Sequence, residues 1–316
     1  APDGFLIAAH AAAKTERLQF LLAHRPGFVA PTVAARKLAT LDELSGGRLG
    51  VHIISGGSDL DQARDGDFTD HGGRYRRSRE YVEVMKKVWT GTGPFDHEGE
   101  FYKVKGAYSE IRCRQVPHIP VYGGGGSDAA IQSLAPVLDV FMLWGEPLAE
   151  THAFMEQVRA AARPFGMRPT FSLSTRPILA DTEDKAWERA QGILARITEL
   201  TGGRAPVPEN AGSRRLLAAA AAGDMHDSCL WARIATATGA RGNSTALVGT
   251  PDTVANAMLE YYKLGATSLL IRGYDPVPDT EQYGAELIPR VRELVAQYDH
   301  EQVARRVADA VNGRPA

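Results

Sequence analysis

Short apolar runs alternate with amphipathic segments along most of the chain, and this alternation constrains the fold more than any other feature. A polar or glycine-rich turn follows each run, and helical spacing of apolar residues comes next. Strands that alternate with helices in this way form right-handed β-α-β units around a parallel sheet. We expect six core strands, at 18–23, 49–54, 118–122, 139–144, 170–179 and 268–271.

Helix signals separate these strands. Pro31 begins one helical pattern and Gly46-Gly47 ends it, which is the usual placement of proline and glycine at helix termini. Residues 59–73 are rich in Asp and Gly and predict a polar loop, and 91–105 predict a small hairpin. Helices are expected at 5–13, 31–44, 75–89, from after Pro147 to about Phe165, at 182–194, at 251–264 and at about 281–295.

Two α/β folds are compatible with this order. A doubly wound sheet holds six strands, whereas a (β/α)8 barrel needs eight. The chain begins without Met at Ala1 and enters a helical pattern almost at once, which is typical of the middle of a fold. We therefore prefer a TIM (β/α)8 barrel whose N-terminal β-α-β unit is absent from this chain, and expect a single domain over 1–316.

Composition excludes several classes of protein. The chain has 316 residues, 44% of them hydrophobic, and a formal net charge of −2, so neither nucleic acid nor an anionic membrane is an expected partner. No apolar run approaches the roughly 20 residues that span a bilayer. Cys113 and Cys229 have no metal-binding spacing, so we expect no metal and a reducing, cytoplasmic location.

One stretch carries a specific chemical signal. The apolar run at 118–122 leads into four glycines, Gly123 to Gly126, and then into Ser127-Asp128, where a helix N-cap belongs. Glycines let the backbone approach a ligand, and free N–H groups at a helix start suit an anion such as phosphate. The spacing matches neither a P-loop nor a Rossmann fingerprint. A tight turn without a ligand remains the alternative.

A segment at about 198–244 interrupts the alternation. It contains Gly202-Gly203, several prolines and an alanine run at 218–222. A long insertion of this kind is usually a functional lid or a disordered linker. Because it follows a strand end, which is the active face in barrels, we expect a lid.

Several motifs together resemble the bacterial-luciferase-like flavin monooxygenases, and within them most closely the FMNH2-dependent alkanesulfonate monooxygenases. The resemblance runs in order over nearly the whole chain. It is carried by 31–48 with its Ser45-Gly46-Gly47-Arg48 end, Asp70-His71 with Arg74-Tyr75, Gly124 to Asp128, Trp144-Gly145-Glu146-Pro147, Thr245 to Gly249, and Arg272-Gly273-Tyr274.

This resemblance implies a luciferase-like TIM barrel with a lid insertion. It also implies FMN used as FMNH2, supplied by a separate NAD(P)H-dependent flavin reductase, with O2 as cosubstrate. The implied reaction cleaves the C–S bond of a small organosulfur anion, an alkanesulfonate, to aldehyde and sulfite through a C4a-peroxyflavin. A homodimer or homotetramer is the family expectation.

Three alternatives remain open. The same flavin chemistry could act on a sulfone, an alkane or a heterocycle, because Arg176 stands where the sulfonate enzymes have a histidine and His52 where they have an asparagine. A more distant relative would use the deazaflavin F420 for hydride transfer. The chain could also be a flavin-binding protein without catalysis.

The candidate cofactor-binding residues follow strand ends or begin helices. His52 and Ser55 lie at the end of one expected strand, on the catalytic face of a barrel, where they could contact the flavin ring edge or the ribityl chain. A satisfied buried pair is the alternative. His71 and Tyr75 are four residues apart, so they share one helical face. Trp144 forms either a pocket wall or core. With the glycine stretch, the cofactor set is His52, Ser55, His71, Tyr75, Gly124, Gly125, Gly126, Ser127 and Trp144.

The candidate catalytic residues are Arg25, Arg176, Arg241 and Tyr274. A sulfonate is an oxyanion, and the planar fork of arginine binds such groups through charge-assisted hydrogen bonds. Arg241 lies on the expected lid, whose closure would bring positive charge over the anion and expel water. Tyr274 could donate a proton or hydrogen bond. A surface ion pair is the alternative for any single arginine.

Overall fold

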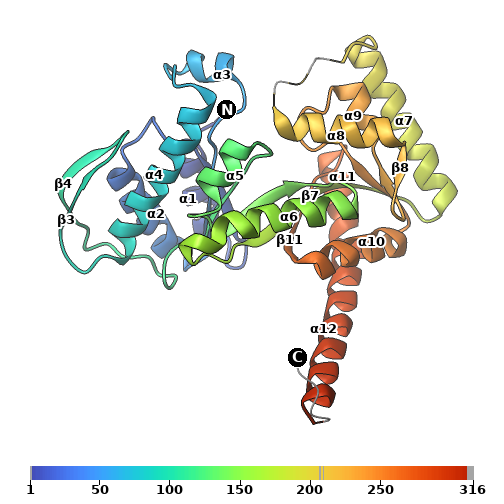
Figure 1. The fold of residues 1–316 in the computed structure, drawn as a ribbon. Helices are drawn as coiled ribbons and strands as arrows, with labels where there is room; N and C mark the ends of the chain where they lie inside the picture. The colour runs from blue at the N-terminus through green and yellow to red at the C-terminus, as the bar shows by residue number, and fades with distance from the viewer. Residues whose placement is uncertain (1, 206–207, 209, 312–316) are drawn as a thin grey trace. The chain divides into compact units, whose positions relative to one another are not determined.

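The computed structural model describes residues 2–205, 208 and 210–311, shown as a ribbon in Figure 1. The chain divides into two compact units. Unit 1 comprises Ala1–Met142 and Met155–Thr170, and unit 2 comprises Leu143–Phe154 and Phe171–Ala316. Each unit contains strands that pair in parallel, while a single domain over the whole chain stays a prediction.

Unit 1 is built on a parallel sheet with one buried face. Leu22 lies opposite Val51, which in turn lies opposite Val121, and all three side chains are buried. The alternate position His52 is only half-buried, as expected for a sheet with one face packed against helices. The strands pair in the order β1 (Phe20–His24), β2 (Leu49–Ile53), β5 (Val121–Gly124) and β6 (Val140–Trp144).

Helices α2 (Pro31–Ser45) and α4 (His71–Thr90) pack against each other in unit 1. Pro31 occupies the first turn of α2, and Gly46 ends the helix in the left-handed conformation, as the sequence predicts. The Trp89 indole N–H donates to the Ala35 carbonyl at 2.9 Å and joins the two helices. The other α-helices that lie wholly in this unit are α1 (Gly4–Lys14), α3 (Asp59–Arg64) and α5 (Asp128–Leu134).

Arg48, at the end of the Ser-Gly-Gly-Arg motif, fastens the start of this unit. Its guanidinium donates to the carbonyls of Ala12 at 3.1 Å, Thr15 at 2.9 Å and Leu18 at 2.6 Å. Its Nε donates to the Ser45 carbonyl at 2.5 Å. One side chain therefore satisfies carbonyls at the ends of α1 and α2 and just before β1, which is a structural role for a family motif.

The predicted hairpin is confirmed as the antiparallel pair β3 (Phe95–Glu98) and β4 (Lys103–Ala107). Glu80 on α4 holds its turn, because the carboxylate accepts the backbone N–H groups of Phe101 at 2.9 Å and Tyr102 at 2.8 Å. The buried carboxylate is thereby satisfied by the loop that it orders.

Unit 2 is organised around the long strand β7 (Thr170–Leu179). Two strands pair in parallel with successive halves of it: β11 (Ala266–Ile271) along the first half and β10 (Ala246–Gly249) along the second. Ile178, Trp231 and Val248 form a core with the buried face of α7 (Glu183–Thr201). The remaining helices include α10 (Pro251–Leu264), α11 (Pro276–Gln282) and α12 (Ile288–Val311); α6 (Leu148–Ala162) belongs to both units.

The insertion is folded rather than a plain linker over its described residues. It contains α8 (Ala211–Ala222), a short hairpin of β8 (Met225–His226) and β9 (Leu230–Trp231), and α9 (Arg233–Thr238). The hairpin continues onto β10 by antiparallel pairing of β9. Pro206, Val207 and Glu209 lie outside the described residues.

The insertion is fastened to the Trp-Gly-Glu-Pro motif within unit 2. Arg215 of α8 donates to both carboxylate oxygens of Glu146, with its Nε at 2.8 and 3.0 Å and its Nη2 at 2.5 Å. The Asp227 carboxylate accepts the Leu148 N–H at 2.9 Å. The motif thus anchors the segment that the sequence singles out as a lid.

Three sequence-based predictions are wrong in detail. Among the described residues, the apolar run 246–249 forms a seventh strand, β10, that takes part in parallel pairing. The expected loop 59–73 contains α3, which Ser58 caps by accepting the Asp61 N–H. The closing helix is longer than 281–295: α11 passes through a π-helical turn, Tyr283–Leu287, into α12. None of the helices in the described part of the chain is long and apolar enough to cross a membrane.

Candidate functional site

The predicted phosphate-binding residues form the turn between β5 and α5 in unit 1. Gly124 ends β5, and Gly125 and Gly126 lead to Ser127, the N-cap of α5. The Ser127 hydroxyl oxygen accepts the backbone N–H three residues on at 3.2 Å, so the hydroxyl hydrogen can donate to a further acceptor. This turn offers small residues and a hydroxyl donor to an anion.

Gly125 lies directly against Tyr75. A Cβ atom at Gly125 would lie 2.5 Å from the Tyr75 hydroxyl oxygen and 2.6 Å from the Ala130 methyl, so the position has room for no side chain. Burial raises the pKa of Tyr75, and the Arg74 guanidinium opposes that rise. The phenol is therefore protonated at neutral pH and presents a hydrogen-bond donor beside the glycine backbone.

His71 and Tyr75 share the first turns of α4. Their ring centroids are 5.0 Å apart and the rings meet edge to face at 84°. Asp70 fixes the start of this helix, because its carboxylate accepts the Gly73 N–H at 2.6 Å. Tyr75 thus contacts both His71, four residues earlier on the same helix, and Gly125, 50 residues further along the chain.

His52 and Ser55 lie at and after the end of β2. Burial lowers the pKa of His52 to about 4, so the imidazole is neutral at pH 7 and offers one donor and one acceptor. In the strand register His52 lies opposite Ala23 and Tyr122. Ser55 is buried with its hydroxyl oxygen 2.9 Å from that of Ser78. Its side chain therefore belongs to a satisfied buried pair, and a cofactor role for both residues stays a prediction.

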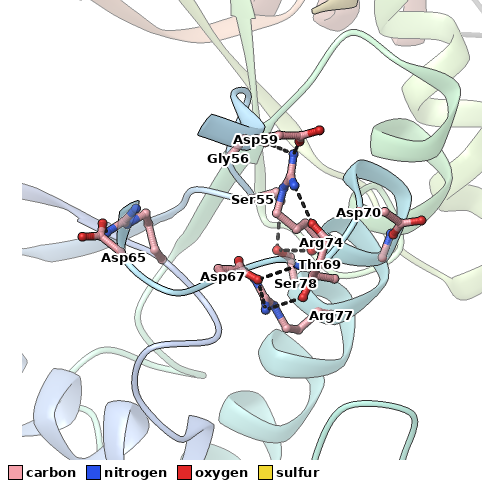
Figure 2. Close-up of polar contacts among 12 residues, drawn as sticks. Ser55, Gly56, Asp59, Asp65, Asp67, Thr69, Asp70, Arg74, Arg77 and Ser78 are labelled. Atoms are coloured by element: carbon pink, nitrogen blue, oxygen red, sulfur yellow. Dashed lines mark hydrogen bonds and ion pairs between the residues drawn. The ribbon is translucent and has the colours of Figure 1, made fainter. Parts of the chain in front are cut away.

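Arg74 organises the loop that follows β2, as Figure 2 shows. Its guanidinium donates to the carbonyls of Thr69 at 2.6 Å and Gly56 at 3.4 Å and to the Asp59 carboxylate at 2.7 Å. The Arg74 side chain is 1% exposed, whereas that of Asp59 is 82% exposed. The buried cation is thus paired with a carboxylate that water solvates.

Arg77, one turn further along α4, is paired differently (Figure 2). It donates to both carboxylate oxygens of Asp67, at 3.1 and 2.5 Å, and to the Thr69 hydroxyl at 3.1 Å. The Arg77 and Asp67 side chains are 11% and 6% exposed. Their hydrogen bonds hold the pKa of the Asp67 carboxyl well below its usual range, so the pair stays ionised and its charges cancel.

Arg25 lies beside an open cavity of about 610 Å³ in unit 1, which the loop after β1 and residues 65–69 line together with Arg77. Arg25 forms an ion pair with the cavity-lining Asp65, and its guanidinium lies 4.4 Å from the centroid of the Phe28 ring. An anionic substrate would have to compete with Asp65 for this guanidinium. The predicted catalytic role of Arg25 is untested.

Arg176 and Tyr274 meet in unit 2. The Arg176 guanidinium carbon lies 5.1 Å from the centroid of the Tyr274 ring, and its Nε donates to the Asn243 carbonyl at 2.7 Å. Burial raises the pKa of Tyr274 to about 12, although the Arg176 charge opposes this. The Tyr274 hydroxyl is buried without a hydrogen-bond partner. An unsatisfied buried phenol next to a guanidinium is a position where a polar ligand would be stabilised.

Trp144 and Arg241 have different surroundings in unit 2. Trp144 packs against the cluster of Leu216 and Ala240, and a Cβ at Gly212 would lie 2.9 Å from its ring. These contacts support the interpretation of Trp144 as a core residue, whose ring packs against α8. Arg241 is exposed on the turn between α9 and β10, after Ala240 at a φ of 51°. Its lid role remains a prediction.

The buried arginines were missed from the sequence. Arg74 appears there only as part of a family motif, and Arg77 not at all, because their partners Asp59 and Asp67 lie in a loop 10 to 15 residues away. The sequence does contain four aspartates within 59–67, shortly before a helix start that is rich in arginine. Among the described residues, no group of three or more His, Cys, Asp or Glu side chains could hold a metal ion.

Parallel strands that alternate with helices, with glycine and polar residues after the strand ends, are typical of a (β/α)8 barrel, and the luciferase-like relatives confirm the predicted fold class. The model of the luciferase-like monooxygenase family matches residues 1–268. The chain belongs to this family.

Solved structures of the same fold match nearly the whole chain. Riboflavin lyase RcaE, solved with modified FMN and riboflavin, has a TM-score of 0.73 at 20% identity over 92% of this chain and 74% of its own. EDTA monooxygenase EmoA from Chelativorans sp. BNC1 has the same TM-score, identity and coverage of this chain, with 78% of its own. An F420-dependent secondary alcohol dehydrogenase has a TM-score of 0.65 at 14% identity, over 92% of this chain and 84% of its own.

Proposed function

We propose that this chain is an FMNH2- and O2-dependent monooxygenase that cleaves the C–S bond of an alkanesulfonate. The observation that carries the proposal is the glycine turn at Gly125 with the Tyr75 hydroxyl against it, in a chain of the luciferase-like monooxygenase family. A turn without side chains beside protonated hydroxyl donors suits a phosphate monoester, which is the end of FMN that distinguishes it from riboflavin.

The residues of unit 1 would bind and orient the cofactor. Tyr75 and Ser127 would donate hydrogen bonds to the phosphate, and the neutral His52 imidazole would offer one donor and one acceptor to the polar edge of the flavin ring. Reduced FMN supplies the two electrons that activate O2, so that one oxygen atom enters the aldehyde and the other leaves as water. A separate flavin reductase in the cytoplasm would supply the reduced cofactor.

The residues of unit 2 would act on the substrate. Arg176 presents a guanidinium of fixed orientation, since the Asn243 carbonyl and the Tyr274 ring hold it, and this suits a sulfonate. Burial raises the pKa of Tyr274 to about 12, so the phenol is protonated at neutral pH and can donate a hydrogen bond to a developing oxyanion. Arg241 would add charge when the insertion closes and would help to exclude water.

A second function is the same oxidation of an uncharged organosulfur compound, an alkane or a heterocycle. The observation that favours it is Arg25, whose guanidinium is already paired with Asp65 and is therefore less available to an anion. Hydride transfer with F420 and flavin binding without catalysis are the further alternatives.

The test is sulfite release from a panel of alkanesulfonates, with FMN, NAD(P)H and an added flavin reductase. We expect sulfite from the parent and a loss of about tenfold or more for Arg241→Ala, since a charge-assisted hydrogen bond to the anion is removed. Arg233→Ala is the matched control, because Arg233 is an exposed arginine of the same insertion paired with Asp224. FMNH2 binding without sulfite from any sulfonate would reject the substrate and leave the cofactor assignment standing.

A further inference from the structure

Arg176 is a half-buried arginine of unit 2 whose charge is not cancelled by a carboxylate of the described residues. Arg215 of the same unit is paired with Glu146. The hydrogen bond that Arg176 makes is instead to a neutral group, the Asn243 carbonyl, which accepts its Nε–H at 2.7 Å. A cation that is partly withdrawn from water without a counter-ion favours the binding of an anion.

Two sides of the Arg176 guanidinium are already in contact with the protein. The Tyr274 ring lies against its face, with 5.1 Å between the guanidinium carbon and the ring centroid. The Asn243 carbonyl occupies the single hydrogen of Nε. A guanidinium can hold two oxygen atoms through Nε and one Nη, or through both Nη groups. Because Nε is engaged, the pair of Nη groups is the edge that remains for a ligand.

The side chain of Asn243 holds its own peptide in place. Its Nδ2 donates to the Ser174 hydroxyl oxygen at 3.3 Å, and its Oδ1 accepts the Thr245 hydroxyl at 3.2 Å. Thr245 is buried, and its hydroxyl also lies 2.5 Å from the Gly145 carbonyl oxygen. The amide therefore links β7 to the segment that enters β10. Gly242, at a φ of 67°, precedes Asn243 and adds little stiffness, so these side-chain bonds fix the carbonyl that Arg176 uses.

We propose that Asn243 is a positioning residue that orients the Arg176 guanidinium, so that both Nη groups face the ligand. A guanidinium held in this way matches an anion with two or more oxygen atoms on one centre, such as a sulfonate, better than an uncharged sulfone of the same length. The inference rests on the proposed function and adds to it the residue that orients the substrate-binding arginine. Asn243 follows Arg241 by two residues, so the same amide also ties the end of the insertion to β7.

The test compares octanesulfonate with octyl methyl sulfone, an uncharged compound with the same alkyl chain. Each is titrated without oxygen into the protein saturated with FMNH2, and binding is followed by calorimetry. Asn243→Ala should weaken octanesulfonate binding about three- to tenfold, because the Arg176 guanidinium loses its fixed orientation, and should change sulfone binding by less than about twofold. A purely structural role of Asn243 would weaken both ligands to the same extent.

Three further variants complete the experiment. Ser174→Ala removes the acceptor of the Asn243 amide, so it should act in the same direction, and it replaces Asn243→Ala if that variant does not fold. Asn256→Ala is the matched control, because the Asn256 amide also donates to a backbone carbonyl, that of Asp252, on the exposed side of α10 in the same unit. It should leave both affinities unchanged. In an Arg176→Lys background the planar fork is gone, so Asn243→Ala should cost little further octanesulfonate affinity.

The outcomes separate this inference from the proposed function. A parent protein that does not bind octanesulfonate would refute the proposed function, and this inference with it. If the parent binds octanesulfonate, the role of Asn243 is overturned when Asn243→Ala binds it unchanged, weakens both ligands equally, or costs as much in the Arg176→Lys background as in the parent. The proposed function would then still stand. A loss confined to octanesulfonate and to the background that contains Arg176 supports the inference.

Discussion

Gly125→Ala tests the geometry of the glycine turn directly. The added methyl would lie 2.5 Å from the Tyr75 hydroxyl oxygen and 2.6 Å from the Ala130 methyl, against ordinary contacts of 3.4 Å or more. Ala130 is fixed to helix α5, so its methyl cannot rotate away, and Tyr75 would have to move by about 1 Å. Overpacking of this kind costs about 1–3 kcal/mol.

The assay is urea unfolding at constant m-value, combined with FMNH2 titration. We expect the variant to lose about 1–3 kcal/mol of stability and to bind FMNH2 about tenfold more weakly, because the displaced Tyr75 hydroxyl no longer points at the turn. Gly57→Ala is the matched control: nothing lies within 4 Å of a Cβ there, so its effect should stay within about 0.5 kcal/mol.

A double-mutant cycle decides whether the contact itself is responsible. Tyr75→Phe removes the hydroxyl, so Gly125→Ala should cost less in that background by about 0.5–1.5 kcal/mol. Equal costs in both backgrounds would show that the Tyr75 hydroxyl is not the clashing group. A Gly125→Ala variant as stable as the parent would show that the turn has room for a side chain. The close contact between Tyr75 and the glycine backbone would then be rejected.

Three further predictions concern the scaffold. Arg48→Lys should lower the free energy of unfolding in urea by about 1–3 kcal/mol although the charge is kept, because one lysine ammonium cannot reach all the carbonyls that the guanidinium contacts. An unchanged unfolding midpoint would contradict this. Burial lowers the pKa of His24 from its usual 6.5 to about 4. Between these two pH values the imidazole is protonated in the unfolded chain but neutral in the folded chain. The free energy of unfolding should therefore fall between pH 7 and pH 5 by about 2 kcal/mol more in the parent than in His24→Gln. Parallel pH profiles of the two proteins in urea unfolding would refute this prediction. Arg215→Ala leaves Glu146 unpaired and should speed proteolysis within 198–244 several-fold, as measured by limited digestion; unchanged cleavage would exclude the anchor.

The alternation of strands and helices was predictable because each element carries its own signal. Pro31 and Gly46 mark the ends of α2 in the sequence as they do in the structure. The strand at 246–249 was missed because four apolar residues are too few to show a period, and its identity depends on pairing with β7. Local sequence signals thus predict the elements whose ends are marked within their own segment, but not a strand that is recognised only by its pairing.

The glycine turn and the His71 and Tyr75 face were predictable for the same reason, since spacing along one helix fixes which residues meet. The burial of Arg74 and Arg77 was not, because it depends on a loop that folds back over α4 and supplies Asp59 and Asp67. No periodicity records such a loop. Ion pairs between residues far apart in the sequence depend on the tertiary structure. The sequence shows which charged residues are present, but not which of them pair.

Two of the motifs that carry the family resemblance hold the scaffold. Arg48 ends one of them and ties carbonyls at the ends of two helices. Glu146, in another, pairs with Arg215, and its carbonyl accepts the Tyr261 hydroxyl at 2.7 Å. Residues with such duties are required by the fold whatever substrate is bound, so matching them identifies a family rather than a substrate. Substrate choice must therefore be sought outside these motifs, and His52 and Arg176, where the resemblance implies other residues in the sulfonate enzymes, are the positions to exchange first.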